Sequence, residues 1–331
     1  MSSTVDIHTH SGAERGARQR EAPWLRPVPG NRIEQLLSDR GPISQRQREE
    51  LKSAPGFHDA VQRMATALVE HHRGNRVLNA ILSDRGRFFA VLFMLDLHFR
   101  RHDEGIGLTP GRLKELCVEQ GICSATRAGA LLALMKLAGY VAPAPDRRDR
   151  RLRELVPTER LIAQQRARWH YHFVAAAPLL PAAARAVQAL DNPEFVQGLA
   201  RLLSSHFRAG FRFVDHVPAL RLFGERNGGM FLLFTLVSSA SPTLKRHDPI
   251  PVSISGLARG ISSSRVHVLK LLRDAESEGF VKRVENGSVV ILPALERDVL
   301  EFLALGFLWL DYFAGIALDH IGKDAGAGAR G

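Results

Sequence analysis

The chain of 331 residues carries a formal net charge of +11, and 45% of its residues are hydrophobic. This length suggests about two domains with enough apolar side chains for a sizeable core. The positive charge favours an anionic partner, either nucleic acid or an anionic membrane surface. The two cysteines, Cys117 and Cys123, are too few for a disulfide framework and suit a reducing cytoplasm. Because the first residues contain no apolar run, we expect a cytoplasmic protein without a signal peptide.

Residues 1–53 are rich in proline, glycine and arginine and are expected to form a poorly ordered basic segment. Within it, Asp6, His8 and His10 have the spacing of the DxHxH metal motif that opens the barrel enzymes of the amidohydrolase and phosphoesterase groups. Such a barrel requires strands and helices that alternate along the chain. This sequence shows no such alternation, so we expect no metal site.

The first half of the chain contains a series of amphipathic segments followed by a basic hairpin. Apolar residues at helical spacing predict helices over residues 55–68, 86–100, 108–122, 124–138 and 157–176. Thr109 is expected to cap the third of these, with Pro110 at its first position. A strand begins at residue 140, and a strongly basic loop, residues 144–151, leads to a returning strand. Two helices joined by a turn and followed by a hairpin predict a winged helix-turn-helix.

A second region with the same order of elements covers residues 253–292. Serines before its longer helix offer an N-cap, and Gly279 is expected to end that helix in the left-handed conformation. The pair Asn286-Gly287 predicts a hairpin with a type I′ turn. The expected buried stripe of the longer helix consists of Val266, Leu269, Leu272 and Ala275.

The two regions indicate an internal duplication with an offset of about 140 residues. The anchors are short sequence matches that occur in the same order in both copies. Gly139-Tyr140-Val141 aligns with Gly279-Phe280-Val281, Trp169 and Phe173 with Trp309 and Phe313, Asp84-Arg85 with Glu225-Arg226, and Pro55 and Phe57 with Pro193 and Phe195.

The most apolar stretch, residues 299–318, is about long enough to span a bilayer. Glu301 and Asp311 lie inside it, and a carboxylate in hydrocarbon is costly. We therefore expect a helix that is buried against protein and no membrane span.

The first hairpin resembles the wing of the MarR family, the multiple antibiotic resistance regulators, whose pattern there is Asp-x-Arg-Asp-x-Arg followed by a short strand and Leu-Thr. Asp146, Arg148, Asp149 and Arg151 match this pattern, and Val156-Pro157-Thr158 stands near the Leu-Thr step. The order of the helices is similar over about residues 54–176 and, more weakly, over 190–320. The second hairpin lacks the Asp-x-Arg-Asp-x-Arg run, which puts minor-groove reading by that wing in doubt.

MarR proteins are dimers in which the terminal helices of two chains interlock. The resemblance implies a mainly α fold with small β-wings, in which two tandem winged helix-turn-helix (MarR-like) repeats form an intramolecular pseudo-dimer. A further homodimer through the 299–318 helix stays open. The expected divisions are residues 1–53 as the N-terminal segment, 54–176 as repeat 1, 177–192 as a linker, 193–320 as repeat 2 and 321–331 as a flexible tail.

These features predict a sequence-specific transcription regulator that binds double-stranded DNA with two recognition helices in successive major grooves. Arginine and lysine can pair with guanine edges, and wing arginines can enter the minor groove. The residues expected at the DNA are Ser124, Thr126, Arg127, Arg147, Arg148 and Arg150 of the first copy, and Ser263, Ser264, Arg265, His267, Lys270, Lys282 and Arg283 of the second.

In many MarR relatives a small phenolic or carboxylate ligand lies between the helix-turn-helix and the dimer helices and weakens DNA binding. By this resemblance, Arg168, His170, Tyr171 and His172 would line a similar pocket here, and the alternative is a solvated, partly buried helix face. Some relatives sense oxidants through cysteine. Cys117, however, lies on an apolar helical stripe, where a thiol is usually an inert core residue.

The alternative function is a protein-interaction module, or an architectural protein that coats DNA without sequence preference, with degenerate winged helices. The altered second wing and the basic N-terminal segment motivate it. An enzyme is not expected because the chain has no P-loop, dinucleotide glycine fingerprint, HExxH motif or nucleophile elbow. We accordingly expect no cofactor.

Overall fold

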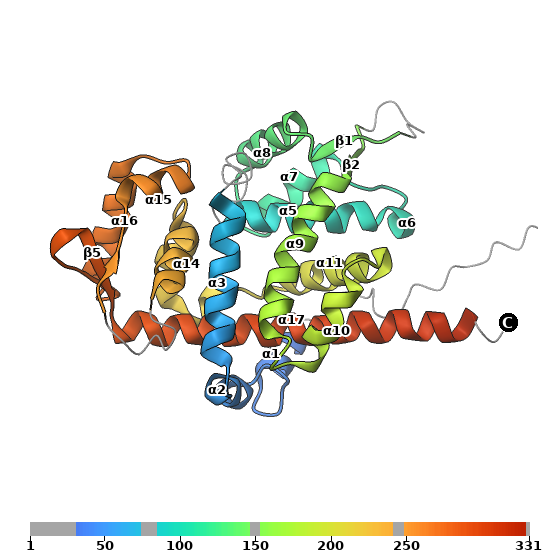
Figure 1. The fold of residues 1–331 in the computed structure, drawn as a ribbon. Helices are drawn as coiled ribbons and strands as arrows, with labels where there is room; N and C mark the ends of the chain where they lie inside the picture. The colour runs from blue at the N-terminus through green and yellow to red at the C-terminus, as the bar shows by residue number, and fades with distance from the viewer. Residues whose placement is uncertain (1–30, 74–84, 146–152, 241–247, 329–331) are drawn as a thin grey trace, which may run out of the picture.

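The structure, a computed structural model, describes residues 31–328 apart from 74–84, 146–152 and 241–247. The described residues form a mainly helical protein with two small antiparallel sheets (Figure 1). The expectation of a mainly α fold with small β-elements is therefore confirmed.

The first half of the chain begins with helices that pack around the core and ends with a hairpin and a long helix. Its elements are α1 (Asn31–Leu37), α2 (Gln45–Ser53), α3 (Phe57–Arg73), α5 (Arg85–Phe99), α6 (Arg101–Glu104), α7 (Pro110–Glu119), α8 (Ala125–Leu137), β1 (Val141–Pro143), β2 (Leu155–Pro157) and α9 (Glu159–Ala176). As expected, Thr109 caps α7, since its side chain accepts a hydrogen bond from the Arg112 amide at 3.2 Å.

The second half largely repeats this order and ends in the longest helix. Its elements are α10 (Pro181–Ala189), α11 (Pro193–Arg208), α12 (Phe213–His216), η2 (Pro218–Leu220), α13 (Arg221–Glu225), α14 (Gly229–Ser239), β3 (Ile250–Pro251), α15 (Ile254–Gly260), α16 (Arg265–Ser277), β4 (Val281–Arg283), η3 (Glu285–Gly287), β5 (Ser288–Ile291) and α17 (Pro293–Gly328).

The two small sheets have the same plan. In the second half β5 lies between β3 and β4. In the first half β2 pairs with β1 on one side and, through the Leu108–Leu155 bridge, with the chain before α7 on the other. We call residues 108–157 the first head and residues 250–291 the second head. In both heads a short strand or bridge, two helices and a hairpin follow in the same order.

The second hairpin turns differently from the type I′ turn that its sequence predicts. Asn286 and Gly287 do have positive φ values, 61° and 72°. However, the hairpin closes through the Val284 amide and the Ser288 carbonyl, which leaves a three-residue turn. The left-handed residues were predictable, whereas the length of the loop was not.

The hairpins also correct the alignment of the two copies. Gly139 and Gly279 end α8 and α16 with φ of 73° and 72°, as expected at an offset of 140. After the hairpins, the Thr158 amide donates to the Tyr140 carbonyl and the Leu292 amide donates to the Phe280 carbonyl, each at 2.9 Å. Tyr140 and Phe280 directly follow the two glycines, so these hydrogen bonds are equivalent. Because Thr158 corresponds to Leu292, the second wing is shorter, and Trp169 does not correspond to Trp309. That anchor of the sequence alignment is wrong.

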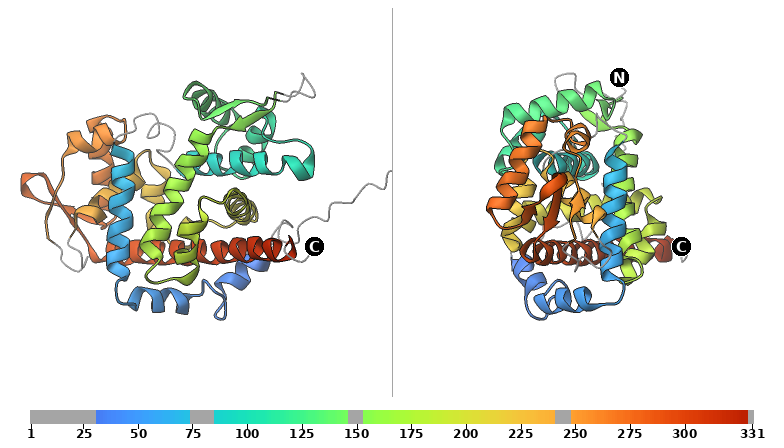
Figure 2. Two further views of the ribbon diagram at one scale, coloured as in Figure 1. Left: turned by 45° about the vertical axis from the view of Figure 1, so that its right-hand side comes forward. Right: turned by 60° about the vertical axis from the view of Figure 1, so that its left-hand side comes forward.

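The two halves exchange helices reciprocally. Helix α3 packs on α14 of the second half, and its counterpart α11 packs on α5 of the first half, while α3 also contacts α9 and α11 contacts α17. Figure 1 shows α3 beside α14, and both views of Figure 2 show α17 passing beneath the two halves. Such an exchange of equivalent surfaces is the pattern of an isologous interface.

A buried polar network fixes the packing of α5 on α11. The Asp96 carboxylate is fully buried; it accepts from Arg100 Nε and from Ser204 Oγ, each at 2.8 Å. Arg201, itself 3% exposed, pairs with Asp103 at 2.5 Å. Breaking a buried pair of this kind by removing one partner leaves an uncompensated charge. The network therefore favours one register between the halves.

The apolar stretch 299–318 lies inside α17, which passes beneath both halves of the molecule (Figure 2). The described residues contain one helix that is long and apolar enough to cross a membrane, Pro293–Gly322. In its most apolar stretch of 18 residues, 56% is buried inside the protein. Glu301 pairs with Arg48 at 2.5 Å and with Lys52 at 2.7 Å. Asp311 accepts from the Ala183 amide at 2.6 Å, at the N-terminus of α10, where an acceptor replaces a missing backbone partner. These contacts are compatible with a soluble protein.

Three segments that were expected to be irregular contain helical residues. Residues 1–30 lie outside the described residues, but residues 31–53 form α1 and α2, and α2 packs on α17 through Arg48 and Lys52. The expected linker, residues 177–192, forms α10, which packs on α9 and α17. The expected tail, residues 321–331, is helical to Gly328.

Candidate nucleic-acid interface and internal cavity

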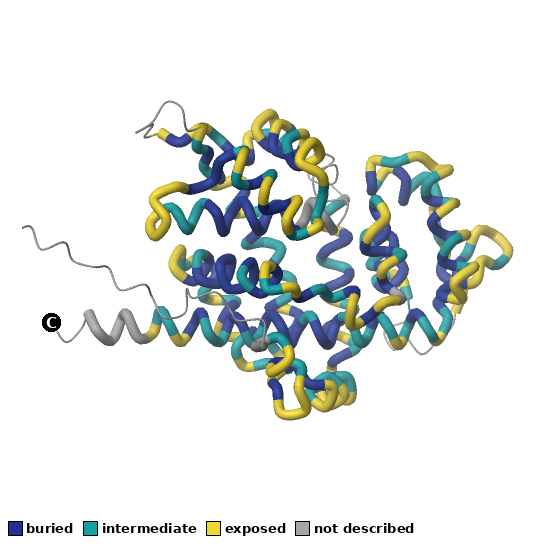
Figure 3. Tube along the Cα trace, turned by 180° about the vertical axis from the view of Figure 1, so that it is seen from behind, coloured by how far each residue is buried: buried dark blue, intermediate teal, exposed yellow. Residues whose placement is uncertain are grey.

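Helix α8 of the first head is a capped helix with one solvent-exposed face. Ser124 is its N-cap, and its Oγ accepts from the Arg127 amide at 3.3 Å. The side chains of Thr126 and Arg127 are exposed, and Figure 3 shows exposed residues along this helix at the edge of the molecule. The inward stripe consists of Ala128, Leu131, Leu132 and Met135.

Helix α16 of the second head has the same design, but its buried stripe differs from the predicted one. Ser264 is the N-cap, and its Oγ accepts from the His267 amide at 3.1 Å. Val266 is 75% exposed, so its assignment to the core is wrong. So many consecutive residues are apolar that two faces fit the helical period, and the stripe that is buried consists of Val268, Leu271, Leu272 and Ala275.

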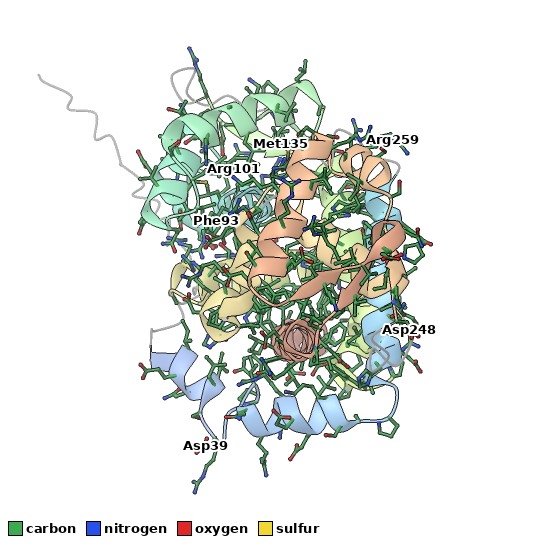
Figure 4. All side chains as sticks on the ribbon, turned by 90° about the vertical axis from the view of Figure 1, so that its left-hand side faces the viewer. Asp39, Phe93, Arg101, Met135, Asp248 and Arg259 are labelled. Carbon is green, nitrogen blue, oxygen red and sulfur yellow. The ribbon has the colours of Figure 1, made fainter. Side chains whose placement is uncertain are left out.

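The outer surface of the second head is basic. Arg265, Lys270 and Arg273 are exposed on α16, and Arg259 is exposed on α15 (Figure 4). Among the described residues, none forms a hydrogen bond or ion pair with the side chain of Arg265 or of Lys270. A shallow depression at the turn between the two helices is lined by Ser255, Ala258, Arg259, Ser262, Ser263 and Arg265. These cations are free to meet an anionic partner.

Two residues predicted at the DNA also form hydrogen bonds within the protein. His267 Nε2 hydrogen-bonds the Asn227 carbonyl at 2.8 Å, which anchors α16 on the chain before α14. Arg283 donates from Nε to Glu276 at 2.6 Å and from its amide at 2.8 Å. These bonds from Arg283 lower the pKa of the Glu276 carboxyl. Both residues thus help to position the second head, and the side chains of Arg283 and its neighbour Lys282 are both exposed.

The first wing is fixed at its base. Glu154 accepts from the Gly107 amide at 2.9 Å and pairs with Arg101 at 3.2 Å. A Cβ at Gly107 would lie 2.5 Å from the Glu154 carboxylate, so a side chain there would disrupt this contact. The predicted DNA contacts Arg147, Arg148 and Arg150 lie outside the described residues.

The turns within the two heads differ by one residue. Gly121 and Ser262 occupy equivalent left-handed positions, with φ of 63° and 52°. In each head the amide of the next residue donates a hydrogen bond to a carbonyl of the preceding helix. The Ile122 amide donates to the Cys117 carbonyl, and the Ser263 amide donates to the Ala258 carbonyl. The N-cap comes three residues after Gly121 but two residues after Ser262, so the first turn contains an additional residue, Cys123.

Replacing Ser262 by glycine should stabilise the protein by about 0.5–1 kcal/mol. The left-handed conformation costs an L-residue about 1–2 kcal/mol, and the greater chain entropy of glycine offsets part of that gain. Urea unfolding would measure the change. Gly121→Ser is the matched reverse variant and should be destabilising. No atom lies within 4 Å of a Cβ at this position, so the side chain causes no clash and only the cost of the left-handed backbone conformation changes. A neutral result for both variants would contradict this account.

An internal cavity of about 200 Å³ lies where the two halves meet. Its walls are mainly aromatic and aliphatic and come from both halves. They include Met64, Phe89, Leu92, Trp169, Phe207, Phe213, Met230, Phe231, Phe234, Phe302, Phe307 and Trp309, and the basic residues are His72, Arg168, His172 and Arg212. A largely apolar cavity with a few polar groups is the usual form of a small-molecule site.

The predicted pocket residues divide into two groups. Arg168 and His172 line the cavity. His170 is exposed, and Tyr171 instead hydrogen-bonds His71 Nδ1 through its hydroxyl at 3.1 Å. One helix cannot direct four neighbouring residues to one side, since consecutive positions point in different directions. His72 and Arg212 were missed because segments far apart in the sequence bring them to the cavity.

The basic groups of the cavity have unusual proton affinities. Burial lowers the pKa of Arg168 to about 10. Burial, together with the positive charge of Arg168, lowers the pKa of His72 and of His172 to about 4. Both histidines therefore stay neutral near pH 7. Each places Nδ1 against a backbone carbonyl, of Leu68 at 2.7 Å and of Arg168 at 2.8 Å. Because a carbonyl only accepts, Nδ1 carries the proton and Nε2 keeps its lone pair.

Among the described residues, no group of three or more His, Cys, Asp or Glu side chains is placed to hold a metal ion. Asp6, His8 and His10 lie outside that part of the chain. No protein-family model, curated protein or solved structure matches the chain.

Proposed function

We propose that the protein is a cytoplasmic, sequence-specific regulator of transcription that binds double-stranded DNA. Each half would be a MarR-like winged helix-turn-helix repeat, and the halves would form a pseudo-dimer within one chain. The observation that carries the proposal is the repeated order of elements, in which each copy presents a capped helix with an exposed face, α8 and α16. A winged helix-turn-helix reads the major groove with the corresponding helix.

In this proposal most of the positive charge at the major groove comes from α16 of the second head. Arg265 and Lys270 would pair with guanine edges, and the exposed Val266 would contact a thymine methyl group. In the first head, Thr126 and Arg127 would enter the groove from α8. Its described outer face otherwise carries mostly alanines, namely Ala125, Ala130 and Ala133.

The two heads differ enough to prefer different half-sites. The first wing is long and contains Arg147, Arg148 and Arg150, which would reach the minor groove. The second wing is short, and Arg283 is bound to Glu276. The preferred DNA site should therefore be asymmetric or an imperfect palindrome. A single chain also fixes one head of each kind per site.

Selection from a random duplex pool and from genomic fragments tests the proposal. The purified full chain should enrich one asymmetric motif, and its affinity for that motif should exceed its affinity for random duplex at every salt concentration. An architectural or protein-interaction module would instead show either a steep salt dependence without a preferred fragment or no DNA binding. That result would contradict sequence-specific regulation.

We further propose that a small aromatic carboxylate acts as an effector in the internal cavity. A cavity of about 150 Å³ can hold benzene, so about 200 Å³ suits a substituted ring. The buried guanidinium of Arg168 would favour an anionic group beside it. Because residues of both halves line the cavity, a ligand there could change how the heads are held.

Replacing Arg168 by methionine should weaken binding of benzoate-type ligands about tenfold or more, because a hydrogen bond to a charged group is lost. Calorimetry with a benzoate series and with uncharged benzyl alcohol would measure this. The alcohol should bind both proteins similarly. Arg166→Met is the matched control, since Arg166 lies on the same helix but pairs with Asp191 outside the cavity. Equal carboxylate affinity in both variants would contradict the role of Arg168.

A further inference from the structure

The two recognition helices share one register. Helices α8 and α16 each contain 13 residues, begin after a capping serine and are followed by a left-handed glycine. Their buried stripes coincide position by position. The stripe of α8 consists of Ala128, Leu131, Leu132 and Met135, and that of α16 consists of Val268, Leu271, Leu272 and Ala275. The exposed positions of the two helices can therefore be compared one by one.

The outer faces of these helices differ in charge at equivalent positions. The exposed cations of α16 are Arg265, Lys270 and Arg273, and the equivalent exposed residues of α8 are Ala125, Ala130 and Ala133. One further exposed position carries a branched side chain with a methyl group in both helices, Thr126 in α8 and Val266 in α16. Where α16 presents long basic side chains, α8 thus presents methyl groups.

Thr126, Ala130 and Ala133 lie on one side of α8, because residues three and four positions apart share a face of a helix. The N-terminal part of a recognition helix is the part that contacts base edges. The side chain of alanine has no hydrogen-bonding group, so it cannot recognise the donor and acceptor pattern of a base pair. The apolar group that the major groove presents is the C5 methyl of thymine. An apolar contact there distinguishes thymine from the other three bases.

We propose that the first head recognises the C5 methyl groups of pyrimidines through Thr126, Ala130 and Ala133. This inference rests on the proposed function and adds the chemistry of the two half-sites. The half-site of the first head contains thymine, or 5-methylcytosine, which carries the same methyl group. The half-site of the second head contains guanine, whose O6 and N7 atoms pair with Arg265 and Lys270. The two heads thus recognise their half-sites through different physical interactions.

Base-analogue scanning of the duplex that the full chain selects tests the proposal. Deoxyuridine in place of thymidine removes only the C5 methyl group and keeps the base pair. Each contacted thymine in the half-site of the first head should lose about fourfold in affinity, as expected for one methylene-sized group. The loss should be equal at low and high salt, because a methyl contact releases no counterions. 7-Deazaguanine, which lacks the N7 acceptor, should lower affinity in the other half-site.

A selection pool in which 5-methylcytosine replaces cytosine identifies the source of the methyl group. If thymine alone is selected there as well, the first head is specific for thymine, and if both bases are selected, it recognises the methyl group in either. A first half-site without an enriched methyl-bearing base, or one in which deoxyuridine has no effect, would overturn the proposal. The same result is expected if α8 binds a protein instead of DNA.

Ala130→Lys gives α8 the residue that α16 has at the equivalent position. This variant should select guanine where the unmodified chain selects a methyl-bearing pyrimidine, and the half-site of the second head should stay the same. Ala184→Lys is the matched control, because Ala184 is exposed on α10, outside the heads. The control adds the same charge and should keep the original motif.

The outcomes separate this inference from the proposed function. An unchanged motif in Ala130→Lys would overturn the role of that position. A selected duplex whose affinity does not depend on any methyl group would leave the proposed function intact and overturn only the recognition of methyl groups. If the full chain selects no duplex at all, the proposed function fails and this inference fails with it.

Discussion

Lowering the pH from 7 to 5 should reduce the free energy of unfolding by about 5 kcal/mol, an upper bound from three histidines, of which His206 is fully buried and His72 and His172 are partly exposed. Burial is the main cause that lowers the pKa of His72, His172 and His206 to about 4 in the folded protein. Unfolded histidine titrates near 6.5. The stability from each histidine is therefore present above pH 6.5 and is lost as the pH falls towards 4. At pH 5 each contributes a loss of about 1.8 kcal/mol.

A loss of this size is comparable to the total stability of many domains. Urea unfolding at pH 7, 6 and 5 would measure it, and His206→Asn is the most informative variant. His206 Nδ1 accepts from Trp309 Nε1 at 2.7 Å, and the asparagine oxygen can take its place without titrating. The variant should lose about a third of the pH dependence. A free energy of unfolding that is constant between pH 7 and 5 would show that these imidazoles are hydrated rather than buried.

Removing the two free cations of α16, in Arg265→Ala with Lys270→Ala, should lower affinity for the selected duplex about 100-fold. Each base contact of this kind contributes about 1–3 kcal/mol. Both side chains are exposed on the outer face of the second head. Electrophoretic mobility shift or fluorescence anisotropy at fixed salt would measure the change. Arg127→Ala should have a smaller effect, since it removes one contact from the other head.

The control for the double variant must remove the same charge elsewhere. Arg185→Ala with Arg46→Ala does this, because both residues are exposed, on α10 and α2, outside the two heads. The control should keep most of its affinity. Equal losses in both double variants would indicate that net charge alone drives binding and would favour the architectural alternative.

Much of the fold was predictable because its signals are local. The glycines that end α8 and α16, and the serines that cap them, act through hydrogen bonds within a few residues of themselves. Val266 was placed wrongly because consecutive apolar residues fit two helical faces equally well. The choice between the faces depends on which neighbour covers α16, and the sequence of one helix does not contain that information.

Other features depend on contacts between distant segments. Helix α2 was not expected because its anchor, Glu301, lies about 250 positions further along the chain. The cavity could be predicted only in part for the same reason. Arg168 and His172 belong to a helix that the sequence indicates, whereas His72 and the aromatic walls come from other helices.

The most direct test is a hydroxyl-radical footprint of the full chain on its selected duplex, with the stoichiometry measured by sedimentation. A single chain should protect two unlike segments whose centres lie about one helical turn apart, roughly 34 Å. Arg265→Ala should weaken protection of one segment and Arg127→Ala protection of the other. Protection of a single segment, or two identical segments that require two chains, would contradict a pair of reading heads within one polypeptide.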